Sequence, residues 1–276
     1  FRNISFALIL LSIIFISINL SLKDSYNNSI KYKIKSFIYG LNYLEKKINY
    51  TDRIAYYKIN INGNEIYRFC TEDSDEIKLD SSNLRVNCLK KGITNRRIFF
   101  IEGNSFTAHF IPMFNEIKID DSVYFNHIGG SLKNTSVELI NNLKQEYSEV
   151  VYVTHISNKK YLNTLLKIQK KFNENIKILI LGATPHIYSN FKPLECFIKN
   201  INCEYDTSED INQRRIESLN LQIEEIANND LNFQYFDPYK SVCPNRYCKA
   251  FDKDKDLITH RDAAHLTIEG SLLIVN

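Results

Sequence analysis

The stretch 97–110, RIFFIEGNSFTAHF, contains the transition that decides the fold. Its apolar run, Ile98–Ile101, predicts a buried strand, and a glycine, an asparagine and a serine follow almost at once. Gly103 permits a tight turn, and the residues after Ser105 predict a helix. A serine in this place has two interpretations, a helix N-cap or a nucleophile held at the end of a strand.

The same alternation of strand and helix continues downstream. Apolar runs predict strands at residues 97–102, 122–128, 149–156, 176–182 and 232–236. Helical periodicity predicts helices at residues 105–115, 134–147, 158–173 and 208–228. This order predicts an α/β domain in which helices cover both faces of a parallel sheet. Because right-handed crossovers place the carboxyl ends of parallel strands on one edge, we expect the functional site there.

The N-terminal part has a different composition. Residues 4–22 carry no charge and are long enough to cross a hydrocarbon layer of about 30 Å as one helix. A cleaved signal peptide is the alternative, but no A-x-A cleavage pattern follows. The sequence therefore predicts a transmembrane helix in residues 1–22 as the end of a truncated membrane domain. An extracytoplasmic linker and lead-in region follows at 23–92, and the α/β domain at 93–276.

Charge and motif content exclude some classes of function. The net charge of +3 over 276 residues is too small to indicate nucleic-acid binding, and no basic cluster is long enough to follow a phosphate backbone. No C-x-x-C pair occurs and no histidine lies at zinc-ligand spacing, so the sequence predicts neither a metal nor a cofactor.

The cysteines indicate a compartment. The six of them form three pairs that are local in sequence: Cys70 and Cys88, Cys196 and Cys203, Cys243 and Cys248. A disulfide within each pair would close a short loop, although sequence alone cannot select one connectivity and free buried thiols are an alternative. With an apolar segment in front of the domain, three disulfides favour an oxidising, extracytoplasmic location.

The stretch 261–271, RDAAHLTIEGS, supplies a second chemical motif. Asp262 and His265 are three residues apart, so a helical turn or a tight loop places both on one face. A carboxylate there can accept a hydrogen bond from one imidazole nitrogen and leave the other free to take a hydroxyl proton. The alternative is a capping aspartate near an unrelated histidine.

Together the two motifs resemble those of the SGNH/GDSL hydrolase superfamily, which has a G-[D/N]-S block after its first strand and a D-x-x-H block near its C-terminus. The stretch 241–271, SVCPNRYCKAFDKDKDLITHRDAAHLTIEGS, narrows the resemblance through the cysteine pair shortly before D-x-x-H. It looks like the C-terminal SGNH domain of acyltransferase-three membrane proteins, which O-acetylate bacterial surface polysaccharides. The resemblance implies a flavodoxin-like three-layer sandwich preceded by one transmembrane helix.

The resemblance also assigns roles to residues of this chain. It implies that Ser105 is the nucleophile, His265 the general base and Asp262 the carboxylate that orients the base. The backbone N–H of Ser105 would supply part of the oxyanion hole. The sequence departs from the family pattern at Asn104, where an aspartate is usual, and at Phe106, where a histidine is usual.

A second departure concerns the rest of the oxyanion hole, because the G-x-N-D block of the superfamily is absent. Gly129 or Gly130 could donate the second N–H, and Asn158 could replace the missing asparagine. The alternatives are turn glycines and a helix cap. The sequence identifies no partner for the remaining histidines: His109, His127, His155, His186 and His260.

The function implied is O-acyl transfer, with acetyl as the expected group, to hydroxyls of a cell-surface polysaccharide through an ester on Ser105. The implied partners are a membrane acyltransferase domain in the same parent chain, an acyl donor, and a polysaccharide or lipid-linked glycan acceptor. The implied location is the inner membrane, with the SGNH domain in the periplasm. A carbohydrate O-acetyl esterase and a catalytically degenerate glycan-binding module are the alternatives.

Overall fold

A computed structural model describes eight segments of the chain: residues 60–61, 64–65, 83–115, 120–127, 134–184, 193–208, 211–260 and 265–274. The predicted membrane span at 4–22 lies outside them. Within these segments no helix combines the length and the apolar character that crossing a membrane requires. In the lead-in region, β1 (Asn60–Ile61) and β2 (Asn64–Glu65) form a short antiparallel pair.

The main sheet has six strands, in the order β3-β5-β4-β6-β7-β9. The five predicted strands are present as β4 (Arg97–Gly103), β5 (Ser122–His127), β6 (Glu149–His155), β7 (Lys177–Leu181) and β9 (Phe233–Phe236). These five are mutually parallel, as predicted. The sixth, β3 (Leu89–Lys90), was not predicted and pairs antiparallel with β5 at the edge of the sheet. It follows the 3-10 turn η2 (Val86–Cys88).

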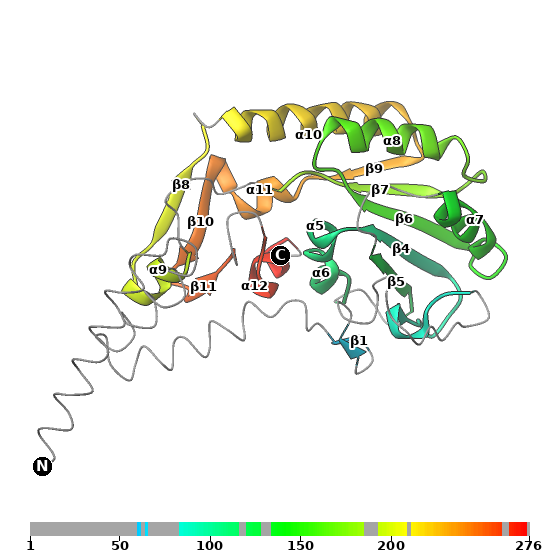
Figure 1. Cartoon of the computed structure of the whole chain (residues 1–276), viewed down its shortest axis with the longest axis horizontal. Coiled ribbons are helices and arrows are strands. Elements are labelled where there is room, and N and C mark those ends of the chain that lie inside the picture. The colour runs from blue at the N-terminus through cyan, green and yellow to red at the C-terminus, as the bar shows by residue number, and fades with distance from the viewer. Residues whose placement is uncertain are drawn as a thin grey trace, which may run out of the picture. The chain divides into compact units, whose positions relative to one another are not determined.

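Helices cover both faces of this sheet. Three of them follow the predicted pattern: α7 (Asn134–Leu143), α8 (Lys159–Gln169) and α10 (Ile211–Asn229). Figure 1 shows α8 and α10 side by side over one face, with α5 (Ser105–Ala108) and α6 (Ile111–Asn115) on the other side of the sheet. The prediction of one helix over 105–115 was wrong. Pro112 lies in the first turn of α6, and its ring would clash with the Ala108 carbonyl in a continuous helix.

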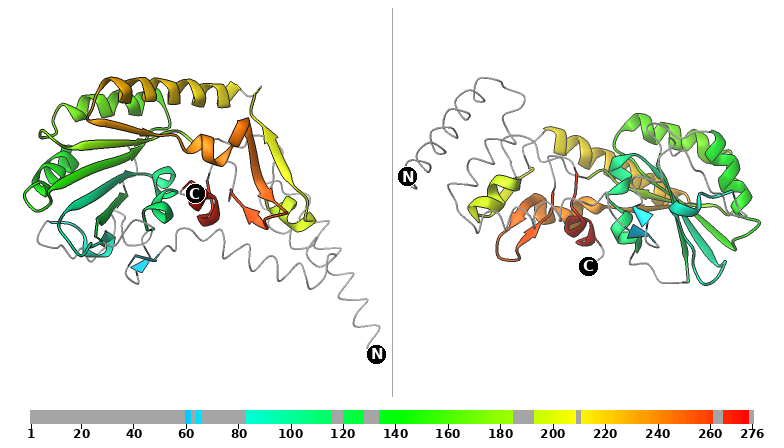
Figure 2. Two further views of the ribbon diagram at one scale, coloured as in Figure 1. Left: turned by 180° about the vertical axis from the view of Figure 1, so that it is seen from behind. Right: turned by 60° about the horizontal axis from the view of Figure 1, so that its bottom comes forward.

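A second, antiparallel sheet was not predicted. Its strands, in the order β11-β10-β8, are β11 (Leu257–Ile258), β10 (Tyr247–Asp252) and β8 (Cys203–Asp206). Beside it lie α9 (Pro193–Lys199), α11 (Pro238–Val242) and the turn η3 (Pro244–Arg246) (Figure 2). The sequence of β8, CEYD, is short and lacks an apolar run, so local patterning gave no signal for a strand.

Two of the three predicted disulfides are confirmed in this region. Cys196 and Cys203 join α9 to β8, with their Cα atoms 6.0 Å apart. Cys243 and Cys248 join the end of α11 to β10, with their Cα atoms 4.1 Å apart. Cys88 is also disulfide-bonded, while its predicted partner, Cys70, lies outside the described residues.

Ion pairs link the amino ends of three neighbouring strands. Glu149, which begins β6, accepts from Arg97 Nε at 2.6 Å and from Lys177 Nζ at 2.8 Å. Arg97 begins β4, and Lys177 begins β7. Burial by itself raises the pKa of Glu149, but the hydrogen bonds from Lys177 and Arg97 outweigh it and hold the pKa below the ordinary value of 4.5.

We expect Glu149→Gln to lower the free energy of unfolding at neutral pH by about 0.5–1 kcal/mol, because all three side chains remain partly exposed. A carboxylate whose pKa is lower in the folded state stabilises the fold above its ordinary pKa. The deficit should therefore disappear as the pH falls through the lowered folded-state pKa of Glu149, below 4.5. Urea unfolding across this pH range measures it, with the exposed Glu174→Gln as the control. A deficit that is independent of pH would contradict the ion-pair explanation.

Candidate active site

Ser105 lies at the carboxyl end of β4 and is the first residue of α5. The residue that caps this helix is Asn104, whose side chain accepts a hydrogen bond from the Phe106 N–H at 3.0 Å. The helix-cap interpretation of Ser105 is therefore wrong, and its hydroxyl is left for another role. Gly103 lets α5 approach the strand end closely, since a Cβ there would lie 1.8 Å from Thr107 Oγ1.

His265, 160 residues downstream, meets Ser105 at this edge. Its Nε2 lies 3.2 Å from Ser105 Oγ, which is hydrogen-bond distance. Both side chains are half-buried, so a substrate can reach them from solvent. The structure thus brings together the strand-end serine and the histidine of the D-x-x-H motif.

The segment that carries His265 is fixed on its C-terminal side. Leu266 is fully buried, and Thr267 N–H donates to the Thr259 carbonyl at 3.0 Å. The Thr267 side chain caps α12 (Ile268–Leu272) by accepting from Gly270 N–H at 2.9 Å. Gly270 lies against the backbone of Thr259, because a Cβ at this position would come within 2.0 Å of that carbonyl oxygen. A close-packed anchor of this kind restricts where the imidazole can lie.

Two aromatic rings contact the imidazole of His265, and a third stacks on one of these two. The Phe106 ring stacks on it with centroids 4.9 Å apart and planes 19° apart. His109 contacts it edge-on, also at 4.9 Å. The ring of His155, at the end of β6, stacks on Phe106: the Phe106 and His155 centroids are 5.9 Å apart and their planes 15° apart. His109 and His155 are both buried, and no sequence motif predicted that either would lie in this site.

A buried carboxylate supports the strand end just before Ser105. Glu102 is fully buried and accepts from Asn126 Nδ2 at 2.8 Å, from the Ser136 hydroxyl, and from the Tyr152 hydroxyl at 3.0 Å. Burial, and then the carboxylate of Glu102, raise the pKa of Tyr152 well above its ordinary value, so the phenol stays a donor. Sequence analysis did not identify Glu102. The signal that could have identified Glu102 is its position directly after the apolar run Ile98–Ile101, because an acidic residue in a buried strand needs partners.

The other predicted site residues divide into two groups. Asp262, Gly129 and Gly130 lie outside the described residues, so their roles stay predictions. Asn158 is exposed and caps α8, where its side chain accepts from the Tyr161 N–H at 3.1 Å. This is the helix-cap role that was the alternative to an oxyanion donor. Across the part of the chain that the structure describes, no group of histidine, cysteine or acidic residues could hold a metal ion.

Several solved structures are similar to this chain. A member of the lipolytic G-D-S-L family from Veillonella parvula is 13% identical, with a TM-score of 0.41 over 65% of this chain and 94% of its own. A putative platelet activating factor from Streptococcus pneumoniae is 15% identical, with a TM-score of 0.39 over 66% and 81%. The catalytic domain of the S. pneumoniae peptidoglycan O-acetyltransferase OatA, with a methylsulfonyl adduct, is 13% identical, with a TM-score of 0.39 over 67% and 89%.

No curated protein matches the chain. A family model, however, covers the greater part of the sequence. The model described as "SGNH domain (fused to AT3 domains)" matches residues 70–276, which include the six-stranded and three-stranded sheets and both members of the Ser105–His265 pair. The chain therefore belongs to the family of SGNH domains that are fused to AT3 domains.

Proposed function

We propose that this chain transfers an acyl group, with acetyl as the expected group, to a hydroxyl of a cell-surface polysaccharide through an ester on Ser105. The observation that carries the proposal is the 3.2 Å separation of Ser105 Oγ and His265 Nε2 at the carboxyl edge of the sheet. In that geometry the imidazole can take the hydroxyl proton as the oxygen attacks.

The reaction has two half-steps that His265 serves in turn. Ser105 Oγ attacks the carbonyl carbon of the donor while its proton passes to His265 Nε2. The bond from that carbon to the donor's leaving group then breaks, and the leaving group receives the proton. In the second half-step a sugar hydroxyl gives its proton to His265 and attacks the acyl carbon. The bond from that carbon to Ser105 Oγ breaks, and Ser105 Oγ takes the proton from His265. Asp262 would accept from His265 Nδ1, and the Ser105 N–H would stabilise the oxyanion.

A carbohydrate O-acetyl esterase is the second candidate. The half-burial of Ser105 and His265 favours it, because water can reach the acyl carbon as readily as a sugar hydroxyl. A glycan-binding module without catalysis receives less support, since it would have no need to keep a serine and a histidine at hydrogen-bond distance.

The family description supports the remaining parts of the proposal. A domain fused to AT3 domains would have a membrane acyltransferase domain in the same parent chain as its source of acyl groups. The disulfides Cys196–Cys203 and Cys243–Cys248 support an extracytoplasmic site, the periplasm in a bacterium with two membranes.

The test uses the full chain with 4-nitrophenyl acetate as donor, with and without a soluble polysaccharide. We expect nitrophenol release in both cases and acetyl esters on the polysaccharide in the second, read by mass spectrometry. Release without acetylated polysaccharide would identify an esterase. A folded protein that releases no nitrophenol from any activated ester would refute both catalytic functions.

Phe106→Leu should lower kcat for ester hydrolysis roughly tenfold with little change in KM, because it keeps an apolar side chain but removes the ring stacked on His265. Phe106→Tyr, which retains the ring face, should keep most of the activity. Steady-state kinetics on the pair of variants measure the effect. Equal losses in both variants would mean that the position contributes packing and does not orient the imidazole.

A further inference from the structure

A cavity of about 450 Å³ lies between α10, α11 and the disulfide-closed loop 243–248. Helix α10 lines it with four residues at helical spacing, namely Glu217, Asn220, Leu221 and Glu224. Its volume falls within the range of small-molecule sites, roughly 300–1,000 Å³. The proposed reaction does not use this cavity. We call it the α10–α11 cavity.

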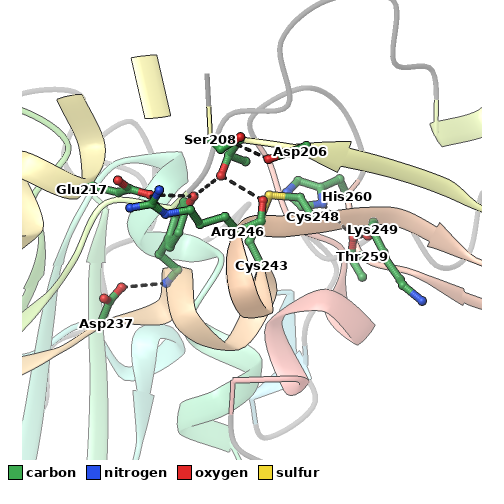
Figure 3. The surroundings of a disulfide bond; sticks show 12 residues. Asp206, Ser208, Glu217, Asp237, Cys243, Arg246, Cys248, Lys249, Thr259 and His260 are labelled. Atoms are coloured by element: carbon green, nitrogen blue, oxygen red, sulfur yellow. Dashed lines mark hydrogen bonds and ion pairs between the residues drawn. A yellow bond between two sulfur atoms is a disulfide. The ribbon is translucent and has the colours of Figure 1, made fainter. Parts of the chain in front are cut away.

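The wall opposite α10 is held rigidly. The Cys243–Cys248 disulfide closes the loop, and Arg246 Nε pairs with Glu217 at 3.2 Å across to the helix (Figure 3). Asn245 and Arg246 both have positive φ angles, 54° and 68°, a conformation that asparagine tolerates and that is uncommon for arginine. The disulfide and the ion pair thus join this wall to its neighbours on both sides of the loop.

The cavity opens at the same edge of the sheet as Ser105. Asp237, directly after β9, lines it. Asn220 accepts from Ala183 N–H at 2.9 Å and donates to the Ala183 carbonyl at 3.2 Å, which links the cavity to the chain just beyond β7. Because β4, β6, β7 and β9 are parallel, their carboxyl ends share one edge. Three interstrand spacings, about 14 Å, separate the ends of β4 and β9.

The lining carries three carboxylates, Glu217, Glu224 and Asp237, and two cationic side chains, Lys240 and Arg246. Glu217 is paired with Arg246, and Lys240 Nζ lies 3.8 Å from Asp237. For the carboxylate of Glu224 the described residues offer no ion-pair or hydrogen-bond partner. Burial raises the pKa of Asp237, which indicates that this end of the cavity is partly shielded from water. A ligand that complements this lining can donate hydrogen bonds to Glu224 and Asp237 and accept them from the remaining N–H groups of Lys240 and Arg246.

The lining also has an apolar part, to which Leu221 and Pro244 contribute. A pyranose ring combines hydroxyls that donate with a C–H face that packs on apolar side chains. Since two of the three carboxylates already face cations, the ligand does not need a positive charge of its own. A neutral, hydroxyl-rich ring matches both parts of the surface.

We propose that the α10–α11 cavity binds one neutral saccharide unit of the acceptor chain, about three strands from the unit whose hydroxyl is acylated at Ser105. The inference rests on the proposed function for the identity of the acceptor, but the binding itself requires no chemistry. Glu224 and Asp237 accept hydrogen bonds from the hydroxyls, and Leu221 contacts the C–H face.

The test measures binding in the full chain with Ser105→Ala, so that no acyl transfer is needed, in a detergent without a sugar headgroup. The chain contains no tryptophan, so Leu221→Trp supplies a single fluorophore in the cavity wall. The probes are the methyl glycosides of glucose, galactose and N-acetylglucosamine. At least one should shift the Leu221→Trp emission in a saturable manner. Leu231→Trp, at a 99% exposed turn outside the cavity, should not respond.

Two adjacent carboxylates on α10 give a matched pair of variants. Glu224 lines the cavity and Glu225 does not. Glu224→Gln should weaken the binding about tenfold, since a hydrogen bond to a charged acceptor is lost, whereas Glu225→Gln should leave it unchanged. Saturation-transfer NMR with the same glycosides on the Ser105→Ala protein, with Leu221 retained, gives an independent reading that no tryptophan can disturb.

Three results would overturn the inference: no glycoside bound by either method, an equal response from Leu231→Trp, or equal losses in Glu224→Gln and Glu225→Gln. Each can be distinguished from failure of the proposed function. If Ser105 forms an acyl ester but no glycoside binds, the catalytic proposal stands and the cavity assignment fails. If a glycoside binds at the cavity but Ser105 never acylates, the cavity is a saccharide site on a non-catalytic module.

Discussion

Ser105→Ala and His265→Ala should each lower ester turnover by roughly 10⁴-fold or more, and the double variant should be little worse than either. In the proposed reaction the two side chains act as one unit, because the hydroxyl is a weak nucleophile until the imidazole 3.2 Å away takes its proton. Removing either partner therefore removes the whole step. Losses that multiply in the double variant would show that the two residues act separately.

Covalent labelling tests the same pair without a substrate. A serine-directed phosphonate should add one label to the wild-type chain and none to Ser105→Ala, as read by intact-protein mass spectrometry. His265→Ala should label far more slowly. Ser157→Ala, which changes a half-buried serine two residues beyond the end of β6, should label like the wild type. A label that persists in Ser105→Ala would assign the nucleophile to another residue.

The third predicted member of the triad can be tested in the same assay. Asp262→Asn should cost less than the loss of Ser105 or His265 if the carboxylate mainly orients the imidazole, although the wrong tautomer would still slow the reaction. Wild-type activity in Asp262→Asn would exclude the carboxylate from the mechanism.

Glu102→Ala should lower the free energy of unfolding by about 3 kcal/mol or more, because it leaves the buried hydroxyls of Ser136 and Tyr152 and the half-buried amide of Asn126 without their acceptor. Glu102→Gln should cost much less, about 1 kcal/mol. Its amide oxygen can still accept from Asn126 and Ser136, and its NH₂ can donate to the Tyr152 hydroxyl.

Urea unfolding monitored by circular dichroism measures this difference, with Glu174→Ala as an exposed control. Because Glu102 lies on the strand end that carries Ser105, the alanine variant should also slow phosphonate labelling under conditions where it remains folded. Equal stability of the alanine and glutamine variants would show that the hydrogen bonds to Glu102 do not hold this strand end.

Local patterns in the sequence were sufficient for the five parallel strands of the main sheet. Each parallel strand is an apolar run, and helices α7, α8 and α10 have a 3.6-residue period, so both signals lie within one element. The pairings Cys196–Cys203 and Cys243–Cys248 could also be predicted from the sequence, since each joins cysteines that are close along the chain. The antiparallel sheet was missed because its strands are short and carry mixed patterns whose partners are distant.

The sequence by itself determined the fold class, the family motifs and two candidate site residues, Ser105 and His265. Only the tertiary structure decided that they meet, because β4 and the segment before α12 are 160 residues apart and only the packed sheet and the anchor at Gly270 join them. It also decided that Asn104 caps α5, that Phe106 stacks on His265, and that Glu102 is buried among three donors. Each of these depends on which side chains the crossovers bring to one edge, and a local pattern contains no information about that.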